Sequence, residues 1–268
     1  MDWVSVVLAG ISGLVGAAIA YLLVRDPREH RTAYVLVLVV SFAIVNALAR
    51  IFVLPPIRVW QYERKIEQEL QEIPAYRVIQ KSDPQTYERI RVIVRDGIRD
   101  GQRSEVLASH IRAVISDLVI IYVPHASDDA VVEFTRVMVR EIEELTQVSP
   151  DYCYQFLFPE QYGPLDLRKH LGAKTLQDDL AALAILIQSA TDTPQPKPDP
   201  SRSQTLLKTV YTQANQEYGD DIRLLDNPHG QSVDKERVCT IIAGFYRHVL
   251  NMPKTQSSLV LRYMFSRR

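Results

Sequence analysis

In this 268-residue chain, the residues best suited to do chemistry are a histidine and two aspartates that follow it closely in sequence. His125 precedes Asp128 and Asp129 in the sequence HASDD, the nearest approach to a cluster of metal ligands. The chain contains no HExxH sequence, and none of its cysteine or histidine pairs has the spacing of a zinc site. A turn leading into an acidic helix N-terminus explains HASDD more simply, because carboxylates there offset the helix dipole. We therefore predict neither a metal nor a cofactor.

The sequence also lacks the motifs of easily recognised enzymes. It has no GxSxG, no Walker-type glycine loop and no GxGxxG. One segment could contain a concealed site, 151–163, in which four aromatic rings and a cysteine fall within seven residues. Core packing is the favoured interpretation of this segment, and an aromatic ligand pocket is the alternative. No catalytic residue is predicted, and whether the protein is an enzyme stays open.

Cys153 and Cys239 are the only cysteines, and both lie in largely apolar segments. A bond between them would close a loop of about 85 residues and stabilise the fold by about 4 kcal/mol through lost chain entropy. The bond needs an oxidising compartment and Cα atoms within about 7 Å of each other. The alternative is a pair of buried, reduced cysteines that pack as small apolar side chains. The candidate disulfide is therefore tied to the side of the membrane on which these residues lie.

The first elements of the predicted fold are two apolar runs, 3–24 and 33–54. Each run is about 22 residues long, and about 20 apolar residues span a bilayer as a helix. Because lipid offers the backbone no hydrogen-bond partner, the two runs predict a transmembrane helical hairpin over residues 1–56. The sequence RDPREHR between them contains no small-residue cleavage site, which favours an uncleaved anchor over a secretory signal.

Small residues gather on one face of the first predicted span. Ala9, Gly13 and Ala17 share this face at helical spacing. Since small residues let two helix backbones approach closely, they predict a helix–helix contact. The partner is either the second span of the hairpin, a second copy of the chain or another membrane subunit.

Basic residues give the predicted orientation. Arg25, Arg28 and Arg31 crowd the turn of the hairpin, and no lysine or arginine precedes the first span. The positive-inside rule then places the turn in the cytoplasm and the rest of the chain outside, in the periplasm of a bacterium. Basic residues after the second span favour the reverse, so a cytoplasmic domain stays open as the alternative.

Beyond the hairpin, apolar residues recur every three or four positions, and no convincing alternating run appears. This pattern predicts an all-α fold that comprises a helical soluble domain (57–192), a proline-rich linker or loop (193–203) and a C-terminal helical segment (204–268) that could pack on the same domain. The short connection between the helices predicted around 104–123 and 128–147 indicates that these two pack antiparallel.

Charge and composition narrow the function. The formal net charge of −1 argues against a nucleic-acid groove, which needs a concentrated basic face. The sequence predicts a membrane-anchored helical interaction or scaffold protein, a subunit of a membrane assembly, with the lipid bilayer and other membrane subunits or itself as partners. The alternatives are a membrane-anchored enzyme with a concealed site near 151–163, and a ligand sensor that signals through an amphipathic helix leaving the bilayer.

Overall fold

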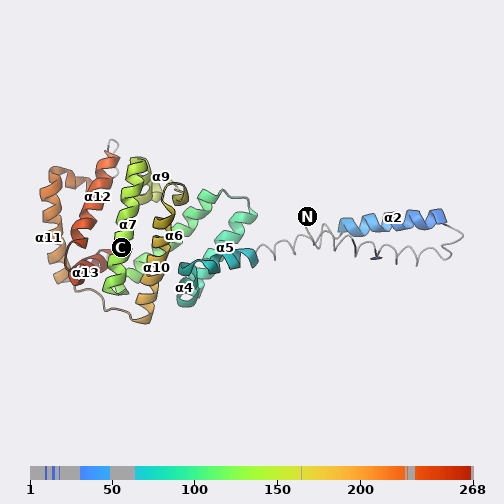
Figure 1. The fold of residues 1–268 in the computed structure, drawn as a ribbon, viewed down its shortest axis with the longest axis horizontal. Helices are drawn as coiled ribbons and strands as arrows, with labels where there is room; N and C mark the ends of the chain where they lie inside the picture. The colour runs from blue at the N-terminus through green and yellow to red at the C-terminus, as the bar shows by residue number, and fades with distance from the viewer. Residues whose placement is uncertain are drawn as a thin grey trace. The chain divides into compact units, whose positions relative to one another are not determined.

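A computed structural model describes residues 31–48, 64–163, 165–226, 228 and 233–266, together with positions 10, 14, 15 and 18. The described residues form helices and irregular connections, without a β-strand (Figure 1). The all-α prediction is therefore confirmed for this part of the chain. Two compact units are present, Met1–Gln68 and Glu69–Arg268, and each is described by itself.

The first unit contains helix α2, Arg31–Leu48. Its apolar side chains are turned to the outside, with exposed fractions of 36% to 66% for Val35, Leu36, Val39, Val40, Phe42 and Ile44. Helix α2 coincides with most of the second predicted span. The predicted contact residues Ala9, Gly13 and Ala17 lie outside the described residues, as do the turn of the hairpin and most of its first span.

The second unit is a body of packed helices. Its elements, in chain order, are α4 (Pro74–Ser82), α5 (Pro84–Arg99), α6 (Ser104–Tyr122), η2 (Val123–His125), α7 (Asp128–Val148), α8 (Pro150–Leu157), α9 (Pro159–Tyr162), η3 (Leu167–Lys169), α10 (Ala173–Asp192), α11 (Pro200–Tyr218), η4 (Gly219–Leu225), α12 (Lys235–Leu250) and α13 (Lys254–Phe265).

Local residue chemistry sets where these helices begin. Asp83 accepts a hydrogen bond from the Thr86 amide and Pro84 occupies the first turn of α5. Ser127 likewise caps α7, since its side chain accepts a hydrogen bond from the Ala130 amide. Helix α11 begins at Pro200, earlier than the predicted segment at 204, because Asp199 caps it and proline is tolerated in a first turn.

Helix α7 lies at the centre of the second unit. It packs against α8, α10, α12 and α13, and its buried side chains include Val131, Val137, Ile142 and Leu145. The C-terminal helices α12 and α13 thus share a core with α7 and α10. The proline-rich stretch before α11 contacts η2, where the Gln195 amide donates to the His125 carbonyl at 2.8 Å.

The predicted antiparallel packing of the helices at 104–123 and 128–147 is wrong. Helix α6 packs chiefly against α5 and α10, whereas α7 packs against α10 and the C-terminal helices. The cause is η2, in which Pro124 continues the chain as a 3-10 turn and redirects it before Ser127 starts α7. Helix α10, distant in sequence, takes the place that α7 was predicted to fill.

Among the described residues, one helix is long and apolar enough to cross a membrane, Ser104–His125, which comprises α6 and η2. This segment is not one of the two predicted spans. Val114 and Leu118 of α6 are buried in the second unit, and Asp117 in its middle lies 3.6 Å from Arg89 of α5. Because a charged pair at the centre of a span is costly in lipid, we assign this helix to the helical body.

A close approach between α11 and α12 explains the glycine in the middle of α12. A Cβ atom at Gly244 would lie 1.8 Å from the hydroxyl of Tyr218 and 2.7 Å from its Cζ. Tyr218 is 7% exposed, so its ring cannot swing aside without unpacking the end of α11. Only glycine leaves room for the ring.

The substitution Gly244→Ala should therefore destabilise the domain by about 1–3 kcal/mol, because steric overlap outweighs a helix-propensity gain of up to about 1 kcal/mol. The measurement is urea unfolding followed by circular dichroism. Gly172→Ala is the matched control, since a Cβ there would meet Glu144 at an ordinary 3.8 Å. Equal unfolding midpoints for the two variants would contradict the close approach.

Candidate functional site

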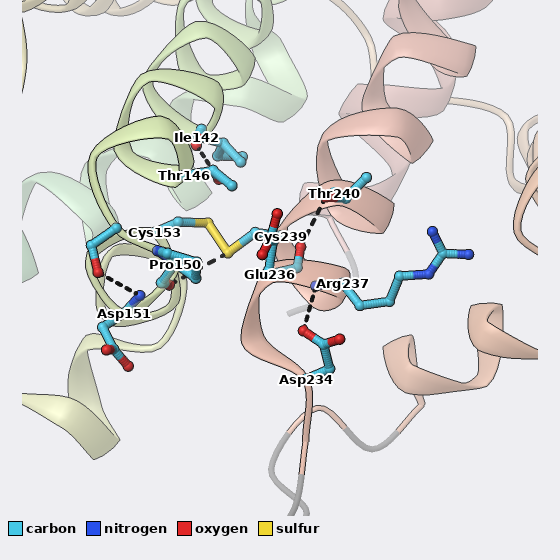
Figure 2. Close-up of a disulfide and its surroundings, with 11 residues drawn as sticks. Ile142, Thr146, Pro150, Asp151, Cys153, Asp234, Glu236, Arg237, Cys239 and Thr240 are labelled. Carbon is cyan, nitrogen blue, oxygen red and sulfur yellow. Dashed lines mark hydrogen bonds between the residues drawn. A yellow bond between two sulfur atoms is a disulfide. The ribbon is translucent and has the colours of Figure 1, made fainter.

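The structure joins Cys153 of α8 to Cys239 of α12 by a disulfide (Figure 2). Their Cα atoms are 6.3 Å apart, and both side chains are fully buried. Each cysteine lies early in a capped helix, with Ser149 capping α8 and Asp234 capping α12. The two caps fix the first turns of these helices and so hold the cysteines opposite each other.

The aromatic segment 151–163 packs beside this disulfide. The Tyr154 ring is 1% exposed, and its centroid lies 4.8 Å from that of Phe158 and 4.9 Å from that of Tyr162. The Tyr154 hydroxyl donates to the Pro228 carbonyl, and burial raises the pKa of Tyr154 to about 12. The rings fill the space between them, which favours core packing over an aromatic ligand pocket.

The residues of HASDD are engaged in holding helices together. Asp128 accepts from Arg262 of α13 at 3.0 Å, and Asp129 pairs with Lys254 at the start of the same helix. His125 Nδ1 lies 3.1 Å from the Gln195 carbonyl. Within the described ranges no group of three or more His, Cys, Asp or Glu side chains could hold a metal ion. HASDD thus links the start of α7 to α13.

The sequence prediction missed a set of ionisable side chains inside the body, here named the Arg112 cluster: Arg112 of α6, Glu141 of α7 and Asp179 of α10. Glu141 is only 4% exposed, and its Oε1 atom has no hydrogen-bond partner. Arg112 attracts both carboxylates electrostatically. Three helices thus contribute ionisable side chains, of which Glu141 is buried and Arg112 and Asp179 are half-buried.

Electrostatics distinguish the two acids of this cluster from ordinary surface carboxylates. Burial raises the pKa of Glu141 well above its ordinary value, the Asp179 carboxylate raises this pKa further, and Arg112 lowers it. Burial likewise raises the pKa of Asp179, against the opposing effect of Arg112. Burial therefore favours the neutral form of both carboxyl groups, and the positive charge of Arg112 opposes this effect.

Packing fixes the position of Arg112. Its guanidinium carbon lies 4.0 Å above the ring centroid of Phe156 on α8, a cation–π arrangement. The nearby Glu144 carboxylate has its own donors, the Thr175 hydroxyl and the Gly172 amide. Glu141 lacks such donors, and its Oε1 is a buried acceptor without a hydrogen-bond partner.

A sequence signal for Glu141 does exist. The residue lies four positions after Val137 and four before Leu145, which places it on the buried face of α7. An acid on an apolar helix face needs a partner from another element. The cation that influences it, Arg112, comes from α6. The periodicity of the sequence predicts this helix but not where it packs, so the cluster can be recognised only in the folded structure.

Comparison of the chain with family models, curated proteins and solved structures finds no match. Its function is therefore inferred from its own residues. The disulfide and the aromatic segment are structural, the HASDD acids are paired, and Glu141 is a buried acid whose Oε1 has no hydrogen-bond partner.

Replacing both Cys153 and Cys239 with alanine should lower the free energy of unfolding by about 4 kcal/mol, because the unfolded chain regains the entropy of a long loop. Denaturant unfolding of the oxidised protein and of the double variant measures this difference. Reductant should lower the unfolding midpoint of the wild type and leave that of the double variant unchanged. Two reactive thiols in denatured, unreduced protein would rule the bond out.

Proposed function

We propose that this chain is a membrane-anchored helical interaction protein, in which the hairpin over residues 1–56 holds the helical body at the bilayer as part of a membrane assembly. The observation that carries the proposal is α2, whose apolar side chains are exposed along its length. An exposed apolar surface of this kind marks a contact with lipid or protein. With 18 residues, α2 is about 27 Å long, close to the thickness of a hydrocarbon core of about 30 Å.

The composition of α2 favours lipid as its main surroundings. After Arg31 the helix contains no charged residue, and its large exposed side chains are those of valine, leucine, phenylalanine and isoleucine. These are the residues that favour insertion as a membrane helix. The small-residue face of the first predicted span, which carries Ala9, Gly13 and Ala17, supplies a surface for a further helix. The proposed partners are other membrane subunits or a second copy of the chain.

Orientation is inferred from two independent features. The arginines of the hairpin turn favour a cytoplasmic turn by the positive-inside rule. The Cys153–Cys239 bond favours an oxidising compartment for the helical body. Both features support a body that faces outward, in the periplasm if the membrane is the cytoplasmic membrane of a bacterium.

An interaction role fits the described side chains better than catalysis does. The carboxylates of HASDD are paired with α13, and the rings of 151–163 pack on one another. The Arg112 cluster lies inside the body, where Glu141 is nearly inaccessible to a substrate. The scaffold role is therefore preferred to the concealed enzyme.

The anchor is tested by expressing the full chain and a variant that lacks residues 1–56. We expect the full chain to stay in the membrane fraction after alkaline carbonate washing and to require detergent for release, because two apolar spans insert essentially irreversibly. The truncated variant should appear in the soluble fraction. Proteinase added to intact spheroplasts should digest the body if it faces outward. Release of the full chain by carbonate would refute the anchor, and protection from proteinase would refute the orientation alone.

The proposed helix contact is tested by Gly13→Leu, which should shrink or destabilise the detergent-extracted assembly because a bulky side chain separates the two backbones. Size-exclusion chromatography with light scattering measures the assembly. Ile11→Leu, on the other side of the same helical wheel, is the matched control and should leave the size unchanged. A Gly13→Leu protein with the mass and thermal stability of the wild type would show that no such contact exists.

A further inference from the structure

Helix α6 is strongly apolar, yet the body encloses little of it. It forms most of the one described segment that is apolar enough to cross a membrane. Of its 19 residues, three are buried, Val114, Leu118 and Val119, on the side that packs chiefly against α5 and α10. Near its end Ile121 is 58% exposed. A long side of α6 therefore stays uncovered.

The uncovered side of α6 has the spacing of a coiled-coil seam. Five residues recur there at alternating steps of three and four, and each is exposed or half-buried: Val106, Ser109, Ala113, Ser116 and Ile120. We name this set the α6 seam. Its ends are apolar and its middle carries small side chains. Small side chains let a second helix approach closely, so the seam suits another helix laid along it.

Ionisable residues beside the seam argue against lipid as its cover. His110 and Asp117 are exposed and lie seven positions apart, so they share one edge of the seam. Asp117 lies 3.6 Å from Arg89 of α5, and both of these side chains are largely exposed. Because ionisable side chains are costly in hydrocarbon, the cover is expected to be a protein surface of complementary charge.

We propose that the α6 seam binds the same seam of a second copy of the chain, antiparallel, about a two-fold axis at Ala113. A two-fold contact places residue i opposite residue j and residue j opposite residue i. Centred on Ala113, the contact places Ile120 opposite the partner's Val106 and His110 opposite the partner's Asp117. Each pair occurs twice, so the apolar ends and the opposite charges are matched together.

A parallel arrangement is disfavoured by the other edge of the seam. In a parallel pair, the edge of His110 and Asp117 would face the opposite edge of the partner, which carries Glu105 and Arg112. Glu105 is already paired with Lys169. The guanidinium carbon of Arg112 lies 4.0 Å above the ring centroid of Phe156, so this side chain is turned toward the body. The antiparallel pair uses only the edge whose charges face outward.

The seam is short, and the proposed anchor makes it sufficient. From Val106 to Ile120 the helix is only about 21 Å long, and so short a contact is weak between free molecules. Two copies held in one bilayer meet at a much higher effective concentration. The inference therefore rests on the proposed function, of which it specifies one partner, a second copy, and the surface that this copy contacts.

Cysteine cross-linking through Ala113→Cys tests the contact. Cys153 and Cys239 are bonded to each other, so the introduced cysteine is the only free thiol. Packed helix axes are about 8–10 Å apart, which brings two Cα atoms that face each other on the axis within the reach of a disulfide, about 7 Å. Membranes that contain the full-length variant are oxidised with copper phenanthroline, and a non-reducing gel measures the dimer.

Ala181→Cys is the matched control, because Ala181 is an exposed alanine on α10, outside the seam. We expect at least about tenfold more dimer from Ala113→Cys than from this control, since the contact raises the local concentration of the second thiol. A dimer yield no higher than that of the control, or an adduct with a different protein, would overturn the pairing of two copies.

The register is tested by coexpressing two full-length variants, Val106→Cys and Ile120→Cys. The antiparallel pair predicts a mixed dimer, whereas dimers of each variant with itself would overturn this register. Far-UV circular dichroism and thermal unfolding show that the variants fold. If the carbonate test refutes the anchor, the same oxidations are applied to the soluble chain, so failure of the anchor and failure of the seam are told apart.

The charge pairs are tested in the Ala113→Cys chain. His110→Asp places acids opposite each other and should lower the dimer yield by about tenfold, because like charges repel across an interface. Adding Asp117→His exchanges the two charges and should restore the dimer. A yield that His110→Asp leaves unchanged, or that the exchange does not restore, would overturn the pairing of His110 with the partner's Asp117.

Discussion

The enclosure of α7 by four other helices is the constraint on which the body depends. The face of α7 that α8, α10, α12 and α13 cover has little access to water, so a polar side chain on this face needs a partner from a neighbouring helix. Asp128 and Glu143 meet this demand with arginines from α13 and α12. Glu141 meets it only in part, since its Oε1 has no donor. Burial accordingly raises the pKa of Glu141 well above its ordinary value.

Helix ends were predictable from sequence because their causes are local. Asp83 and Ser127 begin α5 and α7 by capping amides within three residues of themselves. Gly101 and Gly219 follow α5 and α11 with φ values of 66° and 60°, a left-handed conformation that glycine adopts without steric cost. The all-α class follows from the same short-range periodicity. None of these features requires knowledge of which helix touches which.

Relations between distant segments were not predictable in the same way. The short link between α6 and α7 indicated direct packing, but one 3-10 turn at Pro124 gives that place to α10. The sequence left the pairing of Cys153 with Cys239 open, since their separation depends on how α8 meets α12. The Arg112 cluster was missed for the same reason, because its members come from three helices. Even the hydropathy of Ser104–His125 is ambiguous alone, since a core helix can be as apolar as a span.

The disulfide also determines what happens when the backbone is cut. The non-helical residues 193–199 are mostly exposed and lie between the two bonded cysteines, 86 positions apart in sequence. Exposed connections of this kind are where proteases act first. A nick there would leave α12 and α13 covalently attached to α8, so the fragments would separate only after reduction. The body would keep its C-terminal helices after its chain is no longer continuous.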